Sequence, residues 1–239
     1  MQSFRVIPAP TPYLPVWQAM QDYTAGRGVD GADQIWLVEH EPVYTLGRAG
    51  RSEHLLAPGA IPVVATDRGG QVTYHGPGQV VAYVMFDLRR AGYFVKEYVH
   101  RLEEAVIDTL TELGIGSATR YPGAPGVYVP LQPGRTPRGA AIQHYAKIAA
   151  LGVKVRGGCT YHGVALNVDL DLAPFAGIDP CGYHGLATTD VAGLGGPASL
   201  EGAGDQLAAA IARRLTGATI PAPVISRPLA ALALSPAAP

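Results

Sequence analysis

The run from Lys147 to Val168, KIAALGVKVRGGCTYHGVALNV, constrains the fold most, because two strand-like segments flank a Gly-Gly pair. Such a pair between strand formers is typical of a two-residue hairpin turn. A turn at 157–158 pairs Arg156 with Cys159 and Val155 with Thr160. Since side chains alternate between the faces of a strand, the apolar residues of both segments then fall on one buried face. We expect that face to carry Lys147, Ala149, Leu151, Val153, Val155, Thr160, His162, Val164, Leu166 and Val168.

The hairpin also separates the two cysteines of the chain. Cys159 is expected to point outward at the turn, about ten residues and therefore roughly 30 Å from Lys147. Cys181, in the run DPCGYHG, lies on a later loop that could fold back over the strand end where Val168 pairs with Lys147. Simpler structural roles stay open: Lys147 as an edge residue whose amine reaches water, and Cys181 as a small apolar residue that fills a Pro-Cys-Gly turn.

A cysteine beside a lysine is suited to acyl transfer. An ordinary thiol has a pKa near 8.5, so half ionisation at pH 7 requires about 2 kcal/mol. An ammonium group about 4 Å away supplies up to about 4 kcal/mol at an effective dielectric constant near 20. The resulting thiolate can form an acyl thioester, and a neutral lysine can accept the proton of an incoming amine. A tight turn around Cys181 can also leave backbone N–H groups free to bind an oxyanion.

The remaining sequence predicts a mainly antiparallel sheet backed by a few helices, an α+β fold. Helices are recognised by apolar residues at spacings of three and four, and strands by β-formers bounded by turn residues. We expect a single domain over 1–217, followed by a loosely ordered Pro/Ala-rich tail over 218–239. The predicted segments are helices over 14–24, over 95–113 and from Ser199, and strands over 35–40, 43–47, 61–66 and 79–88.

Composition excludes several classes of function. A formal net charge of −1 argues against a nucleic-acid partner. The cysteines have neither CxxC nor Cys/His spacing, which argues against a disulfide framework or a metal site and favours a reducing compartment, the cytoplasm. The N-terminus lacks a signal pattern, and no apolar run approaches the roughly 20 residues of a membrane span. The chain has no Walker-type or GxGxxG run, so no nucleotide cofactor is expected.

A second glycine-rich run, DRGGQVTYHGPGQVVAY from Asp67 to Tyr83, is a candidate wall for a ligand. Glycines on both sides of the strand-like QVTYH allow the backbone to approach an extended substrate closely. Two ordinary turns around a strand would produce the same pattern. His75 has no partner at metal-ligand spacing and could be a satisfied core histidine, so no metal site is expected.

The motifs HEPVYTLGR, DRGGQVTYHGPGQVVAY, APGVYV, KIAALGVKV, HGVALNVDLDL and DPCG occur in this order between about residues 33 and 190. Together they resemble the octanoyltransferases of lipoate biosynthesis, also called lipoyl(octanoyl) transferases. The resemblance implies the fold of the biotin– and lipoate–protein ligases, which is similar to that of class II synthetases. Ligases of the lipoate type carry a glycine-rich run that ends in His-Asp, whereas His75 is followed by Gly-Pro-Gly-Gln, the transferase form.

The resemblance implies a reaction with two macromolecular substrates. An octanoyl group leaves octanoyl-acyl carrier protein, is held as a thioester on the enzyme, and passes to a lysine of a lipoyl domain. The implied acceptors are the lipoyl domains of 2-oxoacid dehydrogenase complexes and the glycine cleavage H protein. Because the donor is already a thioester, amide formation is downhill, and neither ATP nor another cofactor is implied. Neither nucleic acid nor membrane is an expected partner.

The resemblance also implies the site. The family's nucleophile matches Cys181, and its lysine, which activates the thiol and acts as acid and base, matches Lys147. In the hairpin register Ala150 pairs with Ala165 and residue 152 with residue 163, so small side chains would leave room for a linear acyl chain. The implied pocket residues are Arg68, Gly69, Gly70, Gln71, Val72, Thr73, Tyr74, His75, Ala150, Leu151, Gly152, Gly163, Val164 and Ala165.

The sequence departs from the family pattern in the long segment LQPGRTPRGAAIQHY, residues 131–145. A solvated insertion explains this segment. Alternatively, its Arg135 and Arg138 could contact an acidic carrier protein, a role for which Arg89 and Arg90 are rival candidates.

Two other functions stay open. One is an ATP-dependent lipoate or octanoate ligase on the same fold, whose activity would survive loss of Cys181. The other is a non-catalytic acyl-binding module, which requires neither the cysteine nor an inward-facing Lys147.

Overall fold

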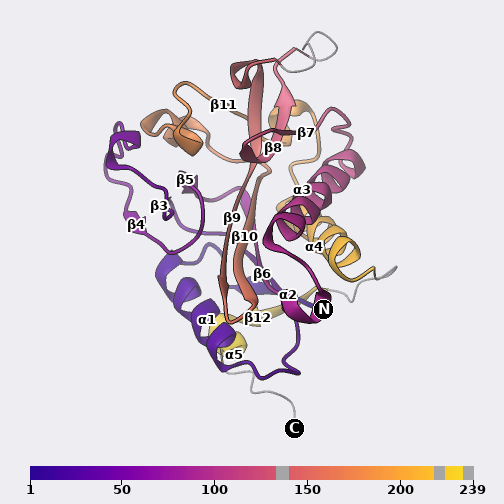
Figure 1. Ribbon diagram of the computed structural model, residues 1–239. Helices are drawn as coiled ribbons and strands as arrows, with labels where there is room; N and C mark the ends of the chain where they lie inside the picture. The colour runs from indigo at the N-terminus through magenta and orange to yellow at the C-terminus, as the bar shows by residue number, and fades with distance from the viewer. Residues whose placement is uncertain (133–139, 218–223, 234–239) are drawn as a thin grey trace.

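The computed structural model describes residues 1–132, 140–217 and 224–233, and its largest element is a mixed β-sheet (Figure 1). In spatial order the strands of this sheet are β12 (Ile225–Pro228), β1 (Gln2–Ile7), β2 (Gln34–Val38), β6 (Gln79–Met85), β10 (Cys159–Asn167), β9 (Tyr145–Arg156), β8 (Ala124–Pro130) and β7 (Thr119–Tyr121), with β11 (Ala187–Thr188) paired beside β9. The central pairs, from β2 to β7, run antiparallel. β1 pairs in parallel with β2 and β12, and β11 does so with β9.

Helices cover both faces of the sheet (Figure 1). Even-numbered residues of β6 from Val80 to Val84 belong to one core, and odd-numbered residues from Val81 to Met85 belong to the other. This double burial explains why β6 reads as a continuous apolar run rather than as an alternating one. α3 (Val95–Glu112) and α4 (Leu200–Thr216) cover one face, α1 (Tyr13–Gly26) and α5 (Leu229–Ala233) the other, and the short α2 (Leu88–Ala91) follows β6.

A smaller sheet of three strands brings the second glycine-rich run to the site. Its order is β4 (Val63–Ala65), β3 (Val43–Leu46) and β5 (Val72–His75). Tyr74 of β5 packs edge-on against Phe175, with ring centroids 5.7 Å apart, and this contact holds the sheet beside the turns that precede and contain Cys181. The 3-10 turns are η1 (Ser52–His54), η2 (Ile142–His144), η3 (Ala173–Gly177), η4 (Pro180–Gly182) and η5 (Ala192–Leu194).

The predicted α+β fold is confirmed. The helices predicted over 14–24 and 95–113 are α1 and α3, and the helix expected from Ser199 is α4. Ser199 caps α4 because its hydroxyl accepts a hydrogen bond from the Gly202 N–H at 3.1 Å. The strands predicted over 35–40, 43–47, 61–66 and 79–88 are present as β2, β3, β4 and β6 with shifted ends.

The predicted hairpin register is also confirmed. Arg156 pairs with Cys159, Ala150 with Ala165, and the turn residues 157 and 158 have φ angles of 56° and 81°. Positive φ at both positions is the type I′ geometry that suits the twist of a hairpin.

The predicted division of side chains between the two faces is wrong at two points. Val127 of β8 pairs with Ala149 but Tyr128 pairs with Lys147, so Ile148 is the extra residue of a β-bulge. Ile148 and Ala149 therefore both enter the α3–α4 core, and Lys147 lies on the opposite face. His162 has a φ of 62°, and its side chain reaches Asp67 instead of that core.

Two further expectations about the hairpin are corrected. Val168 does not pair with Lys147, because the β9–β10 ladder ends at Leu166 and Ala149, and Lys147 pairs with Thr188 of β11. Cys159 does not point into solvent: it is 6% exposed, since the hairpin tip folds against the start of α2, where Leu88 N–H donates to the Gly158 carbonyl at 3.0 Å.

Part of the predicted tail packs on the rest of the chain. Ile225–Pro228 form β12 at the edge of the large sheet, and Leu232 of α5 is 0% exposed in the α1 core. Residues 218–223 and 234–239 lie outside the described residues.

Within the residues just defined, no helix is both long enough and apolar enough to cross a membrane.

Candidate active site

Lys147 and Cys181 lie in direct contact. The Lys147 Nζ atom is 2.7 Å from the Cys181 Sγ atom and 3.2 Å from the Pro125 carbonyl oxygen, to which it donates. Nζ also lies 5.3 Å from the centroid of the Tyr128 ring. The lysine is only 4% exposed, so its amine does not reach bulk water. This excludes the edge role that the sequence left open for Lys147.

The bulge and one glycine explain how the lysine reaches the sulfur. The bulge at Ile148 turns Lys147 away from the helices, and Gly126 of β8 makes room for its side chain. A β-carbon at Gly126 would lie 2.8 Å from Lys147 Cε and 2.9 Å from Nζ. Gly126 also has a φ of 144°, which other residues rarely adopt, and its N–H donates to the buried Glu103 carboxylate at 3.0 Å.

The contacts of Lys147 favour its charged form. Burial opposes that charge, but the Cys181 sulfur and the Tyr128 hydroxyl outweigh burial and raise the pKa of Lys147 above its ordinary value. Burial raises the pKa of Tyr128 to about 12, so the phenol stays protonated at neutral pH. A charged amine thus lies at hydrogen-bond distance from the sulfur of Cys181.

Cys181 sits in a tight turn with a left-handed backbone. Its φ of 57° and ψ of 17° are uncommon for a residue with a side chain. The Gly182 N–H donates to the Asp179 carbonyl at 2.9 Å, and the Asp179 N–H donates to the His54 carbonyl at 2.9 Å. These two hydrogen bonds fix the backbone of the turn that carries Cys181. Strained backbone conformations of this kind cluster at functional sites.

A cavity opens beside Cys181 and encloses about 480 Å³, including its mouth toward solvent. Twelve of the fourteen predicted pocket residues line it together with Cys181. Gly69 and Tyr74 do not. The Gly69 N–H pairs with the Val153 carbonyl at 2.9 Å, and the Tyr74 ring belongs to the separate cluster around Phe175.

The cavity has residues that the sequence did not indicate. Tyr13 comes from α1, where it reads as an ordinary core residue. Val81 and Tyr83 of β6 end the second glycine-rich run, but they were not among the fourteen predicted pocket residues. His162 was expected in the helix-side core, but its left-handed backbone brings it to the cavity. Only the repetition of TYHG at 73–76 and 160–163 hinted at a shared environment.

Two glycines beside the cavity lie close against neighbouring backbone. A β-carbon at Gly163 would lie 2.1 Å from the Ala82 carbonyl oxygen, and one at Gly152 would lie 2.8 Å from the Gly69 carbonyl oxygen. Glycine at these two positions therefore lets the neighbouring chain segments approach closely.

His75 and Arg68 are buried and satisfied by the protein itself. His75 Nδ1 donates to the Gln79 side-chain oxygen at 2.7 Å, and burial lowers the pKa of His75 to about 3. Arg68 is 7% exposed and donates to the carbonyl oxygens of Thr45 and Gln71 at 2.6 and 2.8 Å. His75 is thus a neutral core histidine that also forms part of the wall, and Arg68 shapes the loop.

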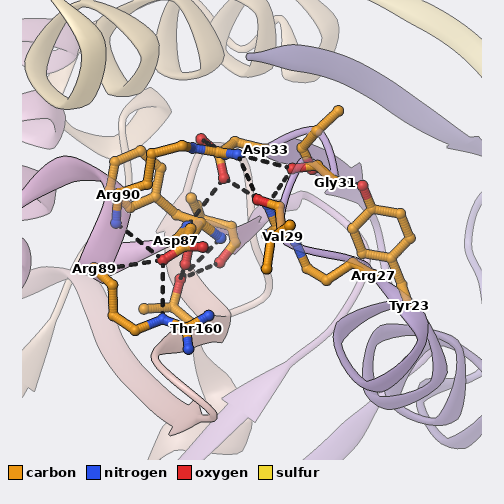
Figure 2. Close-up of polar contacts among 12 residues, drawn as sticks. Tyr23, Arg27, Val29, Gly31, Asp33, Asp87, Arg89, Arg90 and Thr160 are labelled. Carbon is orange, nitrogen blue, oxygen red and sulfur yellow. Dashed lines mark hydrogen bonds and ion pairs between the residues drawn. The ribbon is translucent and has the colours of Figure 1, made fainter. Parts of the chain in front are cut away.

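The arginines proposed for carrier contact are differently placed. Arg135 and Arg138 lie outside the described residues. Figure 2 shows Arg89 and Arg90 beside Asp87 and Asp33, with Arg90 Nη2 2.7 Å from the Asp33 carboxylate and Arg89 Nε 3.5 Å from that of Asp87. Both remain partly exposed, at 63% and 44% of their side chains, so part of each guanidinium still faces solvent.

Cys159 belongs to this arginine cluster and not to the cavity. Burial raises the pKa of its thiol, so the sulfur is held in its unreactive, protonated form. Among the residues that can be placed, Cys181 is therefore the sulfur with the surroundings of a nucleophile.

Comparisons with known proteins identify the family of this chain. Residues 13–211 match the family described as the lipoyl protein ligase A/B catalytic domain. The chain is 62% identical over 199 residues to an octanoyltransferase of Bordetella petrii, covering 83% of this chain and 90% of that one. It is 54% identical over 209 residues to an octanoyltransferase of Aeromonas hydrophila, covering 87% of each.

Solved structures share the fold at low sequence identity. A bipartite lipoate protein ligase of Thermoplasma acidophilum superposes with a TM-score of 0.69 at 15% identity, covering 98% of this chain and 91% of that one. A biotin protein ligase of Aquifex aeolicus superposes with a TM-score of 0.51 at 10% identity, covering 91% and 70%. The match over 13–211 and the identity to the Bordetella relative place this chain in the lipoyl protein ligase A/B catalytic-domain family.

Proposed function

We propose that this protein is an octanoyltransferase that moves an octanoyl group from acyl carrier protein to a lysine of a lipoyl domain through a thioester on Cys181. The observation that carries the proposal is the 2.7 Å contact between Lys147 Nζ and Cys181 Sγ at the edge of the cavity. The name shared by the relatives at 54–62% identity supports the reaction class.

In the first half-reaction the Cys181 thiolate attacks the carbonyl carbon of the octanoyl thioester. A carbon–sulfur bond forms, and the carbonyl π electrons move to oxygen to give a tetrahedral oxyanion. When the carbonyl re-forms, the carrier's pantetheine sulfur leaves as a thiolate and takes a proton from the Lys147 ammonium. The products are octanoyl-Cys181, free carrier thiol and a neutral Lys147.

In the second half-reaction the ε-amine of the acceptor lysine, in its neutral form, attacks the octanoyl-Cys181 carbonyl. The tetrahedral adduct collapses and expels the Cys181 thiolate. The excess proton on the new amide nitrogen passes to neutral Lys147, which restores the ammonium–thiolate pair. The burial of Lys147 favours its neutral form once the thiolate charge is gone, so one residue can serve as acid and then as base.

The residues around the cavity are suited to an unbranched acyl chain. Val72, Val81 and Ala165 present apolar surface to the cavity. The polar atoms of His75 and Arg68 form hydrogen bonds within the protein. Octanoyl burial gains about 0.8 kcal/mol for each methylene group removed from water. We propose that the predicted wall and hairpin residues hold the chain while the carbonyl remains at Cys181.

The acceptors are those that the resemblance to octanoyltransferases implies. We propose lipoyl domains of 2-oxoacid dehydrogenase complexes and the glycine cleavage H protein, because each presents a lysine ε-amine to a modifying enzyme. The partly exposed Arg89 and Arg90 remain candidates for contact with an acidic carrier protein.

The test is a transfer assay with octanoyl-acyl carrier protein and an unmodified lipoyl domain, without ATP. The wild-type protein is expected to octanoylate the domain, and Cys181→Ala is expected to lose at least about 10⁴-fold of that rate, the scale seen when a nucleophile is removed. A parallel reaction contains octanoate and ATP in place of the carrier thioester. Two results would contradict the transferase and favour a ligase. One is octanoylated domain only in the reaction with octanoate and ATP, and the other is full activity of Cys181→Ala.

A further inference from the structure

Two side chains lie against the Cys181 turn and have no chemical role in the reaction steps described above: Gln71, a lining residue of the cavity, and His54. A β-carbon at Gly182, the residue after the nucleophile, would lie 3.3 Å from Gln71 Nε2 and 3.0 Å from His54 Cε1. Gln71 also lines the cavity together with Cys181. The Gln71 amide therefore lies beside the turn that carries the reacting sulfur, in the cavity that Cys181 also lines.

His54 fixes the orientation of this amide. The Nδ1 atom of His54 lies 3.0 Å from the Gln71 side-chain oxygen, so the imidazole N–H donates and the oxygen accepts. The amide nitrogen is then turned away from His54 and toward Gly182. The Gln71 backbone is held as well, because its carbonyl accepts from Arg68 Nη2 at 2.8 Å and from the Gly47 N–H at 3.2 Å.

Two donors beside the sulfur have no acceptor. Among the residues that the structure describes, no hydrogen bond is made by Gln71 Nε2, and no backbone bond is made by the N–H of Cys181. The next two N–H groups of the turn are occupied: Gly182 donates to Asp179 at 2.9 Å, and Tyr183 donates to Pro180 at 3.1 Å. The free donors are thus one side-chain amide and the nucleophile's own N–H.

We propose that the Gln71 amide and the Cys181 N–H form the oxyanion hole of the transfer reaction, with His54 as the residue that positions Gln71. This assignment rests on the proposed thioester function of Cys181. When the thiolate adds to the thioester carbonyl, the π electron pair moves to oxygen, and the two N–H donors bind the negative charge. The same donors serve the second adduct, formed by the incoming amine. Fixed donors of this kind stabilise the transition state more than the ground state.

The decisive experiment compares two reactions of the same sulfur. Acylation by octanoyl-acyl carrier protein passes through an oxyanion, whereas alkylation by iodoacetamide does not. The variant Gln71→Met keeps the length of the side chain and removes the N–H donors. We expect its acylation rate to fall by about 10²-fold, the cost of one oxyanion-hole donor, with alkylation of Cys181 changed by less than about twofold.

Other outcomes overturn the assignment. A parallel loss of acylation and alkylation would show that Gln71 supports the nucleophile itself, and unchanged acylation would show that it has no catalytic part. If the wild-type protein is alkylated at Cys181 but never acylated by the carrier thioester, the proposed function fails, which is distinct from failure of the oxyanion hole.

The role of His54 is tested by rescue. His54→Ala removes the N–H that orients Gln71, and His54→Asn places an amide N–H near the position of Nδ1. Acylation is expected to fall at least about tenfold in the alanine variant and to recover most of that loss in the asparagine variant, with the alkylation rate unchanged in both. Equal acylation rates in the two variants would contradict a positioning role.

Discussion

At the scale of single residues, the site depends on where one lysine points. The sequence identified Lys147 and Cys181 as a pair, and the structure brings them into contact, but the predicted reason was incomplete. Strict alternation assigned Lys147 to the face of Ala149, Leu151 and Val153, which is the helix side. A one-residue bulge has no reliable signature in a single sequence, because Ile148 suits a regular strand as well as a bulged one.

The space beside Lys147 gives a residue-scale prediction. Gly126→Ala places a methyl group 2.8 Å from Lys147 Cε and 2.9 Å from the Ala149 carbonyl, so the ammonium must withdraw from the sulfur. We expect the rate of octanoyl transfer to fall at least about tenfold, because general acid–base catalysis by a positioned side chain contributes roughly 10²- to 10⁴-fold. Alkylation of Cys181 by iodoacetamide is also expected to be slower.

Gly123→Ala is the matched control for this variant. Gly123 also has a positive φ, 79° against 144° at Gly126, but no atom lies within 4 Å of a β-carbon built there. Alanine is strained at both positions, and only at Gly126 does its methyl group also meet Lys147. If Gly126→Ala and Gly123→Ala lose activity equally, Gly126 does not act through Lys147.

At the scale of elements, local sequence signals were enough to predict the hairpin but not the segments that pack around it. The Gly-Gly turn, the register and the helices α1, α3 and α4 follow from spacing and turn chemistry. The burial of Cys159 was missed because it depends on contact with α2, a segment distant in sequence. The cavity residue Tyr13 was missed for a similar reason, since a tyrosine in an apolar segment reads as core whether or not a cavity lies beside it.

The hairpin turn gives an element-scale prediction. A β-carbon at Gly157 would meet no atom within 4 Å, whereas one at Gly158 would lie 2.3 Å from Arg89 Nε. Asparagine tolerates the left-handed conformation and is the preferred first residue of a type I′ turn. Gly157→Asn should therefore stabilise the protein by roughly 0.4–1 kcal/mol, because it restricts the unfolded chain.

Gly158→Asn is the control, and it should destabilise the protein because Arg89 must move. Urea denaturation monitored by circular dichroism measures both variants. A destabilising Gly157→Asn, or a Gly158→Asn at least as stable as the wild type, would contradict the geometry of the turn.

At the scale of the whole molecule, the large sheet with helices on both faces holds polar groups that must remain neutral. His40 is 0% exposed and donates through Nδ1 to the Thr11 carbonyl at 2.9 Å, so its Nε2 accepts from the Tyr83 hydroxyl at 2.7 Å. Burial lowers the pKa of His40 to about 4. None of this follows from the sequence, where His40 is one residue of a family motif.

The buried histidine predicts how stability depends on pH. Between pH 6.5 and 4 the unfolded chain binds a proton at His40 and the folded chain does not, so the free energy of unfolding falls as the pH falls. The contribution of His40 is on the order of 3 kcal/mol across this window, and His75 adds to it in the same direction. Above pH 6.5 both states are neutral at His40, and the free energy of unfolding no longer depends on its protonation.

The variant His40→Gln keeps a donor and an acceptor but cannot take up the proton. Its unfolding free energy should change less between pH 6.5 and 4 than that of the wild type, as measured by urea denaturation at several pH values. Identical pH dependence of the two proteins would show that His40 does not contribute to acid unfolding.

The thioester on Cys181 is tested most directly by isolating the acyl-enzyme and asking whether it is competent. The wild-type protein is incubated with octanoyl-acyl carrier protein, separated from the donor, and divided between intact-mass analysis with peptide mapping and addition of a lipoyl domain alone. We predict one octanoyl adduct, mapped to Cys181, that moves to the lysine of the lipoyl domain without further donor. An adduct on Cys159, an adduct that the domain cannot discharge, or turnover without any adduct would contradict the mechanism.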